Sequence, residues 1–523
     1  MNSSVRTRRH ASAWITQPRR NNRNTFVLML RRVRVVIAIL FFSLLTLLFL
    51  DISGTLPAYL DWTAKIQFFP SVLAMNLLVV VGLLLVTLLF GRIYCSVVCP
   101  LGVLQDIFAW FGKKHKKNRY AFSPAKSKLR IGVAIAFALI FIVPTTSVIA
   151  YLIEPYSIFG RFASSILKPV YAMCNNVLAT IAEKQDSYLF YQTDVWIRSV
   201  PTALISILTI GLIGVLAVRG GRTWCNTICP VGTILGYLSK FSLFKITVDK
   251  DKCNSCGLCS RNCKSSCIQS KQKEIDYSRC VVCMDCVGKC HKKALSYVPR
   301  CRFVPMDSNS SNKADRSKRG FLKALSLFVI GGTIEAKAKK IDGGLAKIAE
   351  KKVPERETPI KPAGSLSLKN FATHCTACQL CVAACPNNVL RPSSDLTTFM
   401  QPEMSYERGY CRPECNLCSA VCPAGAITKI TAAEKSSIQI GRAVVLKENC
   451  IAHKMDVSCG NCARHCPVGA ILMVKKNKDD PDSTLIPVVD TERCIGCGAC
   501  EHLCPVRPFS AIYVEGYDIH REN

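Results

Sequence analysis

The cysteines of this chain have the spacing of metal ligands. The sequence has 523 residues and 31 cysteines, and most of these fall into six runs of four. Two runs read C-x2-C-x2-C-x3-C, and their members are Cys253, Cys256, Cys259, Cys263, Cys280, Cys283, Cys286 and Cys290. Four later runs each end in Cys-Pro, and their members are Cys375, Cys378, Cys381, Cys385, Cys411, Cys415, Cys418, Cys422, Cys450, Cys459, Cys462, Cys466, Cys494, Cys497, Cys500 and Cys504. Because three thiolates of one such loop and a distant fourth hold a [4Fe–4S] cluster, the sequence predicts six clusters with these cysteines as iron ligands.

Disulfides and zinc explain this pattern less well. A disulfide framework is typical of a short secreted chain. Zinc also binds four cysteines, but repeated runs of ferredoxin spacing favour iron–sulfur clusters. In bacterial two-cluster ferredoxins the fourth cysteine of each run ligates the other cluster, so Cys290 is expected to complete the first cluster and Cys263 the second. Whether the four later runs pair in tandem, or the first with the fourth and the second with the third, stays open.

A different cysteine motif occurs twice. The segment GRIYC-x3-CPLG around Cys95 and Cys99 recurs as GRTWC-x3-CPVG around Cys225 and Cys229, which indicates a duplicated unit. On a helix, positions i and i+4 share one face. If the copies meet about a pseudo-twofold axis, the four thiols share a metal or form redox disulfides; the alternative is a structural role. The leftover cysteines are expected to be plain thiols, and they are Cys174, Cys267 and Cys301.

Apolar stretches predict the elements that carry the two CxxxCP motifs. A helix needs about 20 apolar residues to span a bilayer. Four stretches are apolar enough, and they are residues 35–50, 66–90, 131–153 and 199–218. The first is short, but arginines before it can snorkel to the headgroups and let the helix start earlier. Each CxxxCP motif follows a pair of these spans.

The distribution of charge predicts the orientation of the spans. The formal net charge is +33, and nine arginines and no acidic residue precede Asp51. A second basic block covers residues 92–130. Since Lys and Arg concentrate in cytoplasmic loops, we expect the N-terminus and residues 246–301 in the cytoplasm, and residues 51–65 and 154–198 on the opposite side. The predicted location is the inner membrane of a bacterium, with lipid as a partner. Nucleic acid, the other common partner of a basic protein, is not expected.

A segment with the layout of an export signal follows the second cysteine run. SKRGFLK at residues 317–323 precedes a short apolar core and a small-residue exit at Ala336-Lys337-Ala338. It resembles the twin-arginine signal, with Lys318 in place of the first arginine. Export would place residues 351–523 in the periplasm. The alternative is an amphipathic or buried helix in a cytoplasmic linker.

The histidines exclude the usual membrane haem. All eight lie outside the four spans, at positions 10, 115, 291, 374, 453, 465, 502 and 520. Two histidines within the spans would be needed to hold a b-type haem there. The C-x-x-C-H motif of c-type haem is also absent from the sequence. Electrons are therefore expected to travel through iron–sulfur clusters, with a quinone as a further candidate cofactor.

The predicted architecture has four parts. Residues 1–245 form an α-helical membrane domain with four transmembrane helices, and residues 246–301 an α+β bacterial-type two-cluster ferredoxin. Residues 302–350 form a linker with the signal-like segment, and residues 351–523 a four-cluster ferredoxin-like domain.

These features resemble two known families. Residues 30–300 resemble the NapH/MauN membrane ferredoxins, and residues 317–510 resemble the NapG/MauM ferredoxins. The resemblance implies a quinol dehydrogenase component that takes electrons from the quinol pool and passes them to a periplasmic redox enzyme. No side chain is expected to be catalytic, so the chain is mainly an electron carrier. Two alternatives stay open: an electron donor for metalloenzyme maturation or reactivation, and a polyferredoxin that faces the cytoplasm and serves a cytoplasmic redox enzyme.

Overall fold

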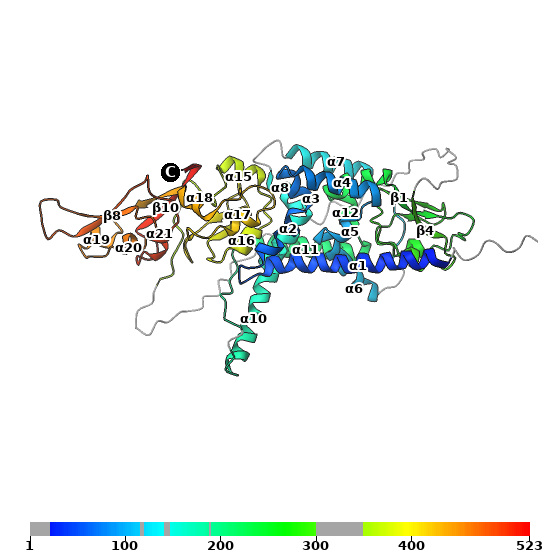
Figure 1. The fold of residues 1–523 in the computed structure, drawn as a ribbon, viewed down its shortest axis with the longest axis horizontal. Coiled ribbons are helices and arrows are strands. Elements are labelled where there is room, and N and C mark those ends of the chain that lie inside the picture. The colour runs from blue at the N-terminus through cyan, green and yellow to red at the C-terminus, as the bar shows by residue number, and fades with distance from the viewer. Residues whose placement is uncertain (1–20, 116–119, 141–146, 188–189, 300–348, 523) are drawn as a thin grey trace, which may run out of the picture.

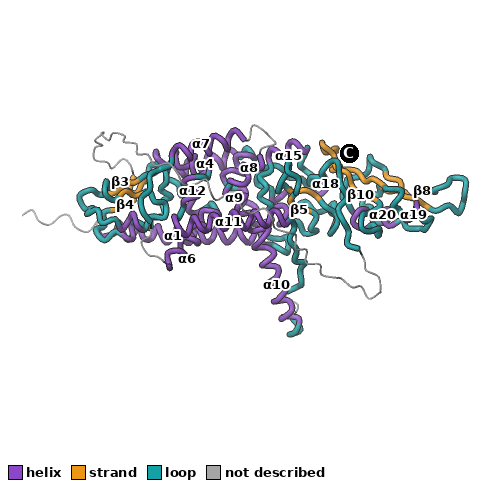
Figure 2. Tube along the Cα trace, turned by 180° about the vertical axis from the view of Figure 1, so that it is seen from behind, coloured by secondary structure: helices purple, strands orange, loops and turns teal. Residues whose placement is uncertain are grey.

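The parts of the molecule follow one long axis. The structure, a computed structural model, describes residues 21–115, 120–140, 147–187, 190–299 and 349–522. Helices fill the middle, a small module with strands β1 (Phe244–Val248) and β4 (Leu295–Pro299) lies at one end, and the C-terminal domain lies at the other (Figures 1 and 2). The two cysteine-rich parts are thus separated by the helices.

The helical unit is built from long and short helices. They are α1 (Asn21–Leu50), α2 (Pro57–Lys65), α3 (Phe68–Leu73), α4 (Leu77–Phe90), α5 (Tyr94–Val97), α6 (Pro100–His115), α7 (Ser127–Ile140), α8 (Ser147–Ile153), α9 (Pro155–Phe162), the π-helical turn η2 (Ala163–Leu167), α10 (Lys168–Glu183), α11 (Val200–Gly220), α12 (Thr223–Thr227), α13 (Pro230–Leu238) and the 3-10 turn η3 (Ser239–Phe241). Several begin with proline, which fits the first helical turn because its missing N–H has no partner there. Helix α11 packs against α6 and α9.

The predicted spans agree with the structure only in part. Two described helices are long and apolar enough to cross a membrane, Val27–Leu50 and Val200–Gly220. The prediction of one helix over residues 66–90 is wrong, because α3 ends before α4 begins. Met75 between them has a positive φ of 52°, and the Asn76 side chain accepts from the Val79 N–H and caps α4. The predicted span 131–153 is divided between α7 and α8, and residues 141–146 lie outside the described residues. Four membrane-spanning helices therefore stay a prediction.

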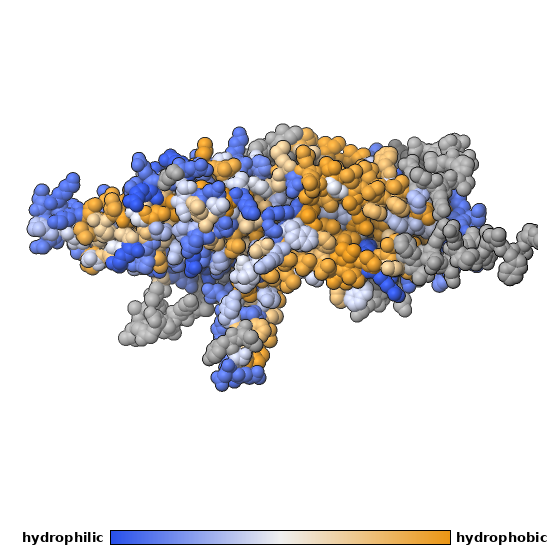
Figure 3. Space-filling view, viewed as in Figure 1, coloured by the Kyte–Doolittle hydropathy of each residue, from blue (hydrophilic) through white to orange (hydrophobic). Residues whose placement is uncertain are grey.

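The surface of the helical unit is apolar. Figure 3 shows a hydrophobic band over the central helices, with hydrophilic surface over the C-terminal domain. Leu78 and Leu208 are 84% and 70% exposed. A soluble monomer rarely exposes so large a continuous apolar surface, which marks contact with a membrane or another protein.

The module after the helices has the predicted α+β character. Besides β1 and β4 it contains α14 (Leu258–Arg261), β2 (Ile268–Gln269), β3 (Glu274–Ile275) and the 3-10 turn η4 (Val287–Lys289). β1 pairs antiparallel with β4, and β2 with β3. The first and last strands thus hold the two cysteine loops together.

The C-terminal domain consists of short helices and two-stranded ribbons. Its elements are α15 (Leu368–His374), α16 (Leu380–Ala384), β5 (Leu390–Pro392), β6 (Pro402–Met404), α17 (Leu417–Val421), α18 (Ala432–Ser437), β7 (Ile438–Val445), α19 (Ile451–Lys454), α20 (Asn461–Arg464), β8 (Ile471–Lys475), β9 (Leu485–Val489), α21 (Ala499–Leu503) and β10 (Ile512–Glu522). β5 pairs with β6, β8 with β9 and β10 with β7, all antiparallel. The signal-like segment before this domain lies outside the described residues.

Candidate iron–sulfur centres

The cysteines of the β1–β4 module are grouped as the two-cluster pattern predicts. The Cys259 thiol lies within electrostatic range of three others, which means close enough for their charges to interact; they are Cys253, Cys256 and Cys290. In the second group, Cys286 lies within range of the set Cys280, Cys283 and Cys263. The fourth cysteine of each run therefore approaches the other run.

Cys267, expected to be a plain thiol, lies beside the second group. Its side chain is buried, and its Sγ is 3.5 Å from Cys263 Sγ. Sequence spacing missed this contact because Cys267 fits no ligand run. It follows Cys263 by four residues, and this short separation was the signal available in the sequence.

The C-terminal runs pair in tandem. Cys381 lies within electrostatic range of Cys375, Cys378 and Cys422, so the first run approaches the last cysteine of the second. Cys418 correspondingly lies near the set Cys411, Cys415 and Cys385. The first run therefore approaches the second and not the fourth, which differs from the nested arrangement.

The third and fourth runs pair in the same way. Cys497 lies near Cys494 and Cys466, and Cys462 near the set Cys450 and Cys459. The Asn461 side chain donates to the Leu503 carbonyl at 2.6 Å, which holds the third loop beside Cys504. The irregular spacing between Cys450 and Cys459 is filled by α19.

The two pairs of C-terminal cysteine runs contact each other through the second and fourth runs. The Cys411 N–H donates to the Cys497 carbonyl at 2.9 Å, and the Tyr406 hydroxyl donates to the Gly496 carbonyl at 2.6 Å. Gly498 is required here, since it has a φ of 77° and an added Cβ would lie 2.2 Å from the Tyr406 ring. The four groups therefore follow the order first, second, fourth, third, away from the helical unit.

The first C-terminal loop is docked on α9 of the helical unit. The Ser157 hydroxyl donates to the Thr376 carbonyl at 2.7 Å. The Gly160 position faces the Cys378 carbonyl so closely that an added Cβ would lie 2.3 Å from its oxygen. Residues 154–198 are predicted to be a connecting segment, and local sequence patterns do not reveal this contact because it joins residues far apart in the chain.

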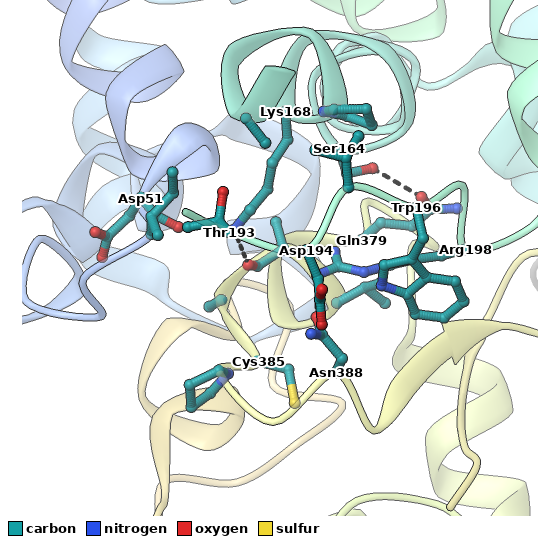
Figure 4. Close-up of a pocket in the computed structure, with 18 of the residues that line it drawn as sticks. Asp51, Ser164, Lys168, Thr193, Asp194, Trp196, Arg198, Gln379, Cys385 and Asn388 are labelled. Atoms are coloured by element: carbon teal, nitrogen blue, oxygen red, sulfur yellow. Dashed lines mark hydrogen bonds between the residues drawn. The ribbon is translucent and has the colours of Figure 1, made fainter. Parts of the chain in front are cut away.

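A polar cavity lies beside this contact. It measures about 260 Å³, and Lys168, Arg198 and Cys385 are among the residues that line it (Figure 4). The Lys168 ammonium donates to the carbonyls of Asp51 at 2.7 Å and Ala383 at 2.5 Å. Lys168 thus ties the helical unit to the loop that leads into Cys385.

The sulfur atoms of the ferredoxin-type runs accept hydrogen bonds from backbone amides. The Ala377 N–H donates to Cys375 Sγ at 3.5 Å, and the Ala511 N–H to Cys504 Sγ at 3.4 Å. Such bonds help to set the potential of a bound cluster. Burial raises the pKa of the Cys378 thiol to about 12, so metal binding at this buried site must release protons.

The structure also brings the two CxxxCP motifs together. The Arg222 guanidinium donates to the Cys95 carbonyl at 2.5 Å, and the Arg92 guanidinium donates to the Cys225 carbonyl at 3.3 Å. Each arginine therefore reaches the cysteine turn of the other repeat, as a pseudo-twofold axis requires. These arginines are not among the predicted site residues, although the Gly-Arg repeated before each motif marks them in the sequence.

No mononuclear metal site is formed by the part of the chain that the structure describes. No three His, Cys, Asp or Glu side chains there lie close enough to hold one metal ion. The thiols of each cysteine run are also too far apart to hold a single metal ion. Cysteines that ligate a cluster lie farther apart, because they surround several iron atoms.

Comparison with known proteins supports the iron–sulfur assignment. A family model described as a 4Fe-4S binding domain matches residues 72–119 and 201–248, which contain the CxxxCP motifs. A model described as a 4Fe-4S dicluster domain matches residues 374–426 and 457–507. The ferredoxin-type protein MauM of Paracoccus denitrificans is 30% identical over 165 residues, which cover 31% of this chain and 73% of that protein. The chain belongs to the MauM family of ferredoxin-type proteins. This similarity agrees with the predicted resemblance to the NapG/MauM ferredoxins.

Other relatives match different lengths. YccM of Escherichia coli, named as an electron transport protein, is 25% identical over 226 residues, 42% of this chain and 55% of YccM. The ferredoxin-type protein NapF of Escherichia coli is 28% identical over 179 residues, 34% of this chain and 99% of NapF. The chain spans 66% of the MauM of Methylophilus methylotrophus. No solved structure was found to match. The protein is thus a ferredoxin-type iron–sulfur electron transfer protein, whereas fusion with a NapH/MauN-type membrane unit stays a prediction.

The crossed ligation in the C-terminal domain can be tested by pairs of substitutions. If Cys375 and Cys422 serve one cluster, Cys375→Ala, Cys422→Ala and the double variant should each lose one cluster's iron. Cys385 belongs to the neighbouring group, so Cys375→Ala combined with Cys385→Ala should lose two. Iron and sulfide analysis of the anaerobically purified variants measures this. Loss of two clusters from the Cys375/Cys422 double variant would contradict the tandem pairing.

Proposed function

We propose that the protein carries electrons across a membrane, from quinol at the end with the β1–β4 module to a redox enzyme at the C-terminal domain. The observation that carries this proposal is the position of the two cysteine-rich parts at opposite ends of the apolar helical unit (Figure 1). A polyferredoxin that faces only the cytoplasm would need both parts on one side. The alternative role in metalloenzyme maturation uses the same path and differs only in the enzyme that accepts the electrons.

The surface of the helices supports a membrane location. The apolar band lies over a helical unit in which two described helices, Val27–Leu50 and Val200–Gly220, have the length that a bilayer requires (Figure 3). Helix α10 projects sideways at the junction with the C-terminal domain (Figure 1), and it exposes Val170, Met173, Val177 and Ile181. An amphipathic helix in this position fits the membrane surface, with its apolar side among the acyl chains.

A second cavity suits a quinol headgroup. It measures about 700 Å³ and lies between α1, α6 and the β1–β4 module. Val35, Ala38 and Ile39 belong to its apolar wall, and Asp106 and Lys264 to its polar end. Ligand sites commonly combine an apolar lining with a few polar groups that orient the ligand. A lipid-soluble quinol can enter such a cavity from the membrane.

The polar end of the cavity adjoins the second cysteine group. Lys264 Nζ lies 3.0 Å from Asp106 Oδ2 and 3.2 Å from Asp285 Oδ2, and Cys283 lies within electrostatic range of Lys264. Burial raises the pKa of Asp106, but Arg222 and Lys264 lower it more strongly, and the result is well below the usual range. Asp106 therefore stays a carboxylate, which can accept a hydrogen bond from a quinol hydroxyl.

The chemistry needs no bond-forming side chain. Quinol oxidation releases two electrons and two protons. Each cluster carries one electron at a time, so the two electrons leave in succession along the cysteine groups. The protons leave on the side of the quinol cavity.

The position of the C-terminal domain is the decisive test. A reporter fused after Asn523, combined with protease access to spheroplasts, should place this domain in the periplasm and the β1–β4 module in the cytoplasm. Detection of both parts in the cytoplasm would refute the transmembrane relay.

The quinol cavity can be tested with two tryptophan substitutions on α1. Ala38 is buried in the cavity wall, so Ala38→Trp should raise the KM for quinol by about tenfold or more, which corresponds to a loss of about 1.4 kcal/mol. Leu40 is 54% exposed on the same helix and is not part of the cavity lining, so Leu40→Trp is the matched control. Stopped-flow reduction of the clusters by quinol measures both, and equal KM values would exclude the cavity as the quinol site.

A further inference from the structure

The cysteines of the two CxxxCP motifs form one buried group in the interior of the helical unit. Their side chains are only 3% to 4% exposed, and they are Cys95, Cys99, Cys225 and Cys229. The Cys229 thiol lies close enough to those of Cys95, Cys99 and Cys225 for their charges to interact, and the Cys99 thiol likewise interacts with Cys95 and Cys225. None of the ferredoxin-type runs includes these thiols, and the relay proposed above has not used them.

Helix N-termini point at this group from both repeats. Cys99 and Cys229 precede the first residues of α6 and α13, and Cys229 caps α13. An added Cβ on Gly102 would lie 2.2 Å from the Cys95 carbonyl oxygen, and one on Gly232 would lie 2.3 Å from that of Cys225. Glycine thus lets both helix N-termini approach the cysteine turns closely. The positive end of a helix stabilises a thiolate.

The sulfur atoms accept N–H hydrogen bonds, as do those of the ferredoxin-type runs. The Gln105 amide donates to Cys225 Sγ at 3.3 Å. The Gly232 N–H donates to Cys229 Sγ at 3.3 Å, and the Arg92 guanidinium lies 3.7 Å from Cys95 Sγ. These sulfurs therefore have the donors that a ligating thiolate accepts.

The positive charge around the four thiols favours a buried anion. Arg92 and Arg222 are both 0% exposed. Arg222 pairs with Asp106 at 2.8 Å, whereas Arg92 forms no ion pair with any carboxylate in the part of the chain that the structure describes. The Arg222 Nη2 and Arg92 Nε atoms are also buried without a hydrogen-bond partner. A buried unpaired cation is costly, and a cluster with four thiolate ligands carries the negative charge that would offset it.

We propose that Cys95, Cys99, Cys225 and Cys229 together hold one iron–sulfur cluster, shared by the two repeats. The family model for a 4Fe-4S binding domain matches each repeat separately, but each repeat supplies only two thiols, so the pair forms a single site. A redox disulfide fits less well, because it exchanges two electrons while the neighbouring clusters exchange one. A mononuclear metal also fits less well, because the thiols are not close enough to hold a single ion.

This cluster would lie between the two ends of the proposed path. On one side, the Arg92 guanidinium donates to the Ser278 carbonyl at 3.1 Å, two residues before Cys280. On the other side, Glu154 lies within electrostatic range of both Cys99 and Cys378. The shared cluster accepts one electron from the Cys280 side and gives one electron to the Cys378 side, and no bond or proton changes. The site rests on its own geometry, and only this bridging role rests on the proposed function.

Native mass spectrometry of the full chain, purified anaerobically in detergent, tests the site. The mass difference between the native and the denatured protein gives the bound iron and sulfide. Cys225→Ser should lose the mass of one cluster, whereas Cys174→Ser, which changes an exposed cysteine of α10, should lose none. Equal cluster mass in Cys225→Ser and the parent protein would overturn the proposal. This readout needs no quinol or acceptor, so it does not depend on the proposed function.

A milder variant covers the case in which Cys225→Ser does not fold. Gln105→Leu removes one N–H donor to Cys225 Sγ and leaves all four thiols in place. It should keep the full cluster mass and lower the midpoint potential of one centre, since a hydrogen bond to sulfur favours the reduced cluster. Redox titration followed by electron paramagnetic resonance measures this. Unchanged potentials of every centre would count against a cluster at Cys225.

Discussion

Replacing Glu501 with alanine is expected to lower the free energy of unfolding of the C-terminal domain by about 3–5 kcal/mol. This is the usual cost of removing one partner of a buried ion pair. Glu501 is 2% exposed, and its Oε1 lies 2.6 Å from the Arg356 guanidinium. Its Oε2 accepts from the Val514 N–H at 2.8 Å. The substitution therefore leaves the Arg356 cation without its carboxylate and the buried Val514 amide without its acceptor. The change is measured by following, as denaturant is added, the loss of cluster absorbance at wavelengths longer than those at which the protein itself absorbs.

A second ion pair of the same domain provides the control. Lys476 and Asp456 lie 2.5 Å apart, but their side chains are 38% and 61% exposed. Exposed pairs contribute about 1 kcal/mol or less. Asp456→Asn removes the charge and suits the positive φ of 54° at this position, so it should have little effect. Similar effects of Glu501→Ala and Asp456→Asn would show that burial of the Arg356 pair does not stabilise the domain.

Replacing Gly160 with alanine is expected to detach the first C-terminal cluster from the helical unit. The new Cβ would lie 2.3 Å from the Cys378 carbonyl oxygen and 3.1 Å from the Phe49 ring. Such overpacking typically costs about 1–3 kcal/mol, and the loop can relieve it by moving away from α9. Electron transfer into the C-terminal domain should then become slower, while the number of bound clusters stays the same.

Gly132 provides a matched control for this prediction. It lies in α7, and an added Cβ there has no atom within 4 Å. Alanine favours a helix over glycine by about 1 kcal/mol, and both substitutions receive that benefit. Stopped-flow reduction and limited proteolysis at the junction compare the two variants. If Gly160→Ala and Gly132→Ala behave alike, α9 does not hold the first cluster in place.

Much of the ferredoxin part could be predicted because its ligands are local in sequence. Three cysteines of each run come from one loop, and the third can lie in the first turn of a short helix, as Cys259 does in α14 and Cys500 in α21. The same spacing distinguishes the ferredoxin-type runs from the CxxxCP motifs in the sequence. The membrane part was predicted less well. Hydropathy does not register the turn at Met75 or the cap at Asn76, which divide one apolar stretch into α3 and α4.

The type of protein, a ferredoxin-type iron–sulfur carrier with a basic, apolar N-terminal half, follows from local sequence patterns alone. Which groups lie next to each other follows from the tertiary structure. The tandem pairing of the later runs, the docking of Gly160 on Cys378 and the meeting of the two CxxxCP motifs all join distant parts of the chain. The Arg222 contact with Cys95, for example, spans 127 positions. Local spacing encodes a cluster loop, but contacts between loops depend on how the helices pack, and that packing positions the four thiols between the two ferredoxin ends.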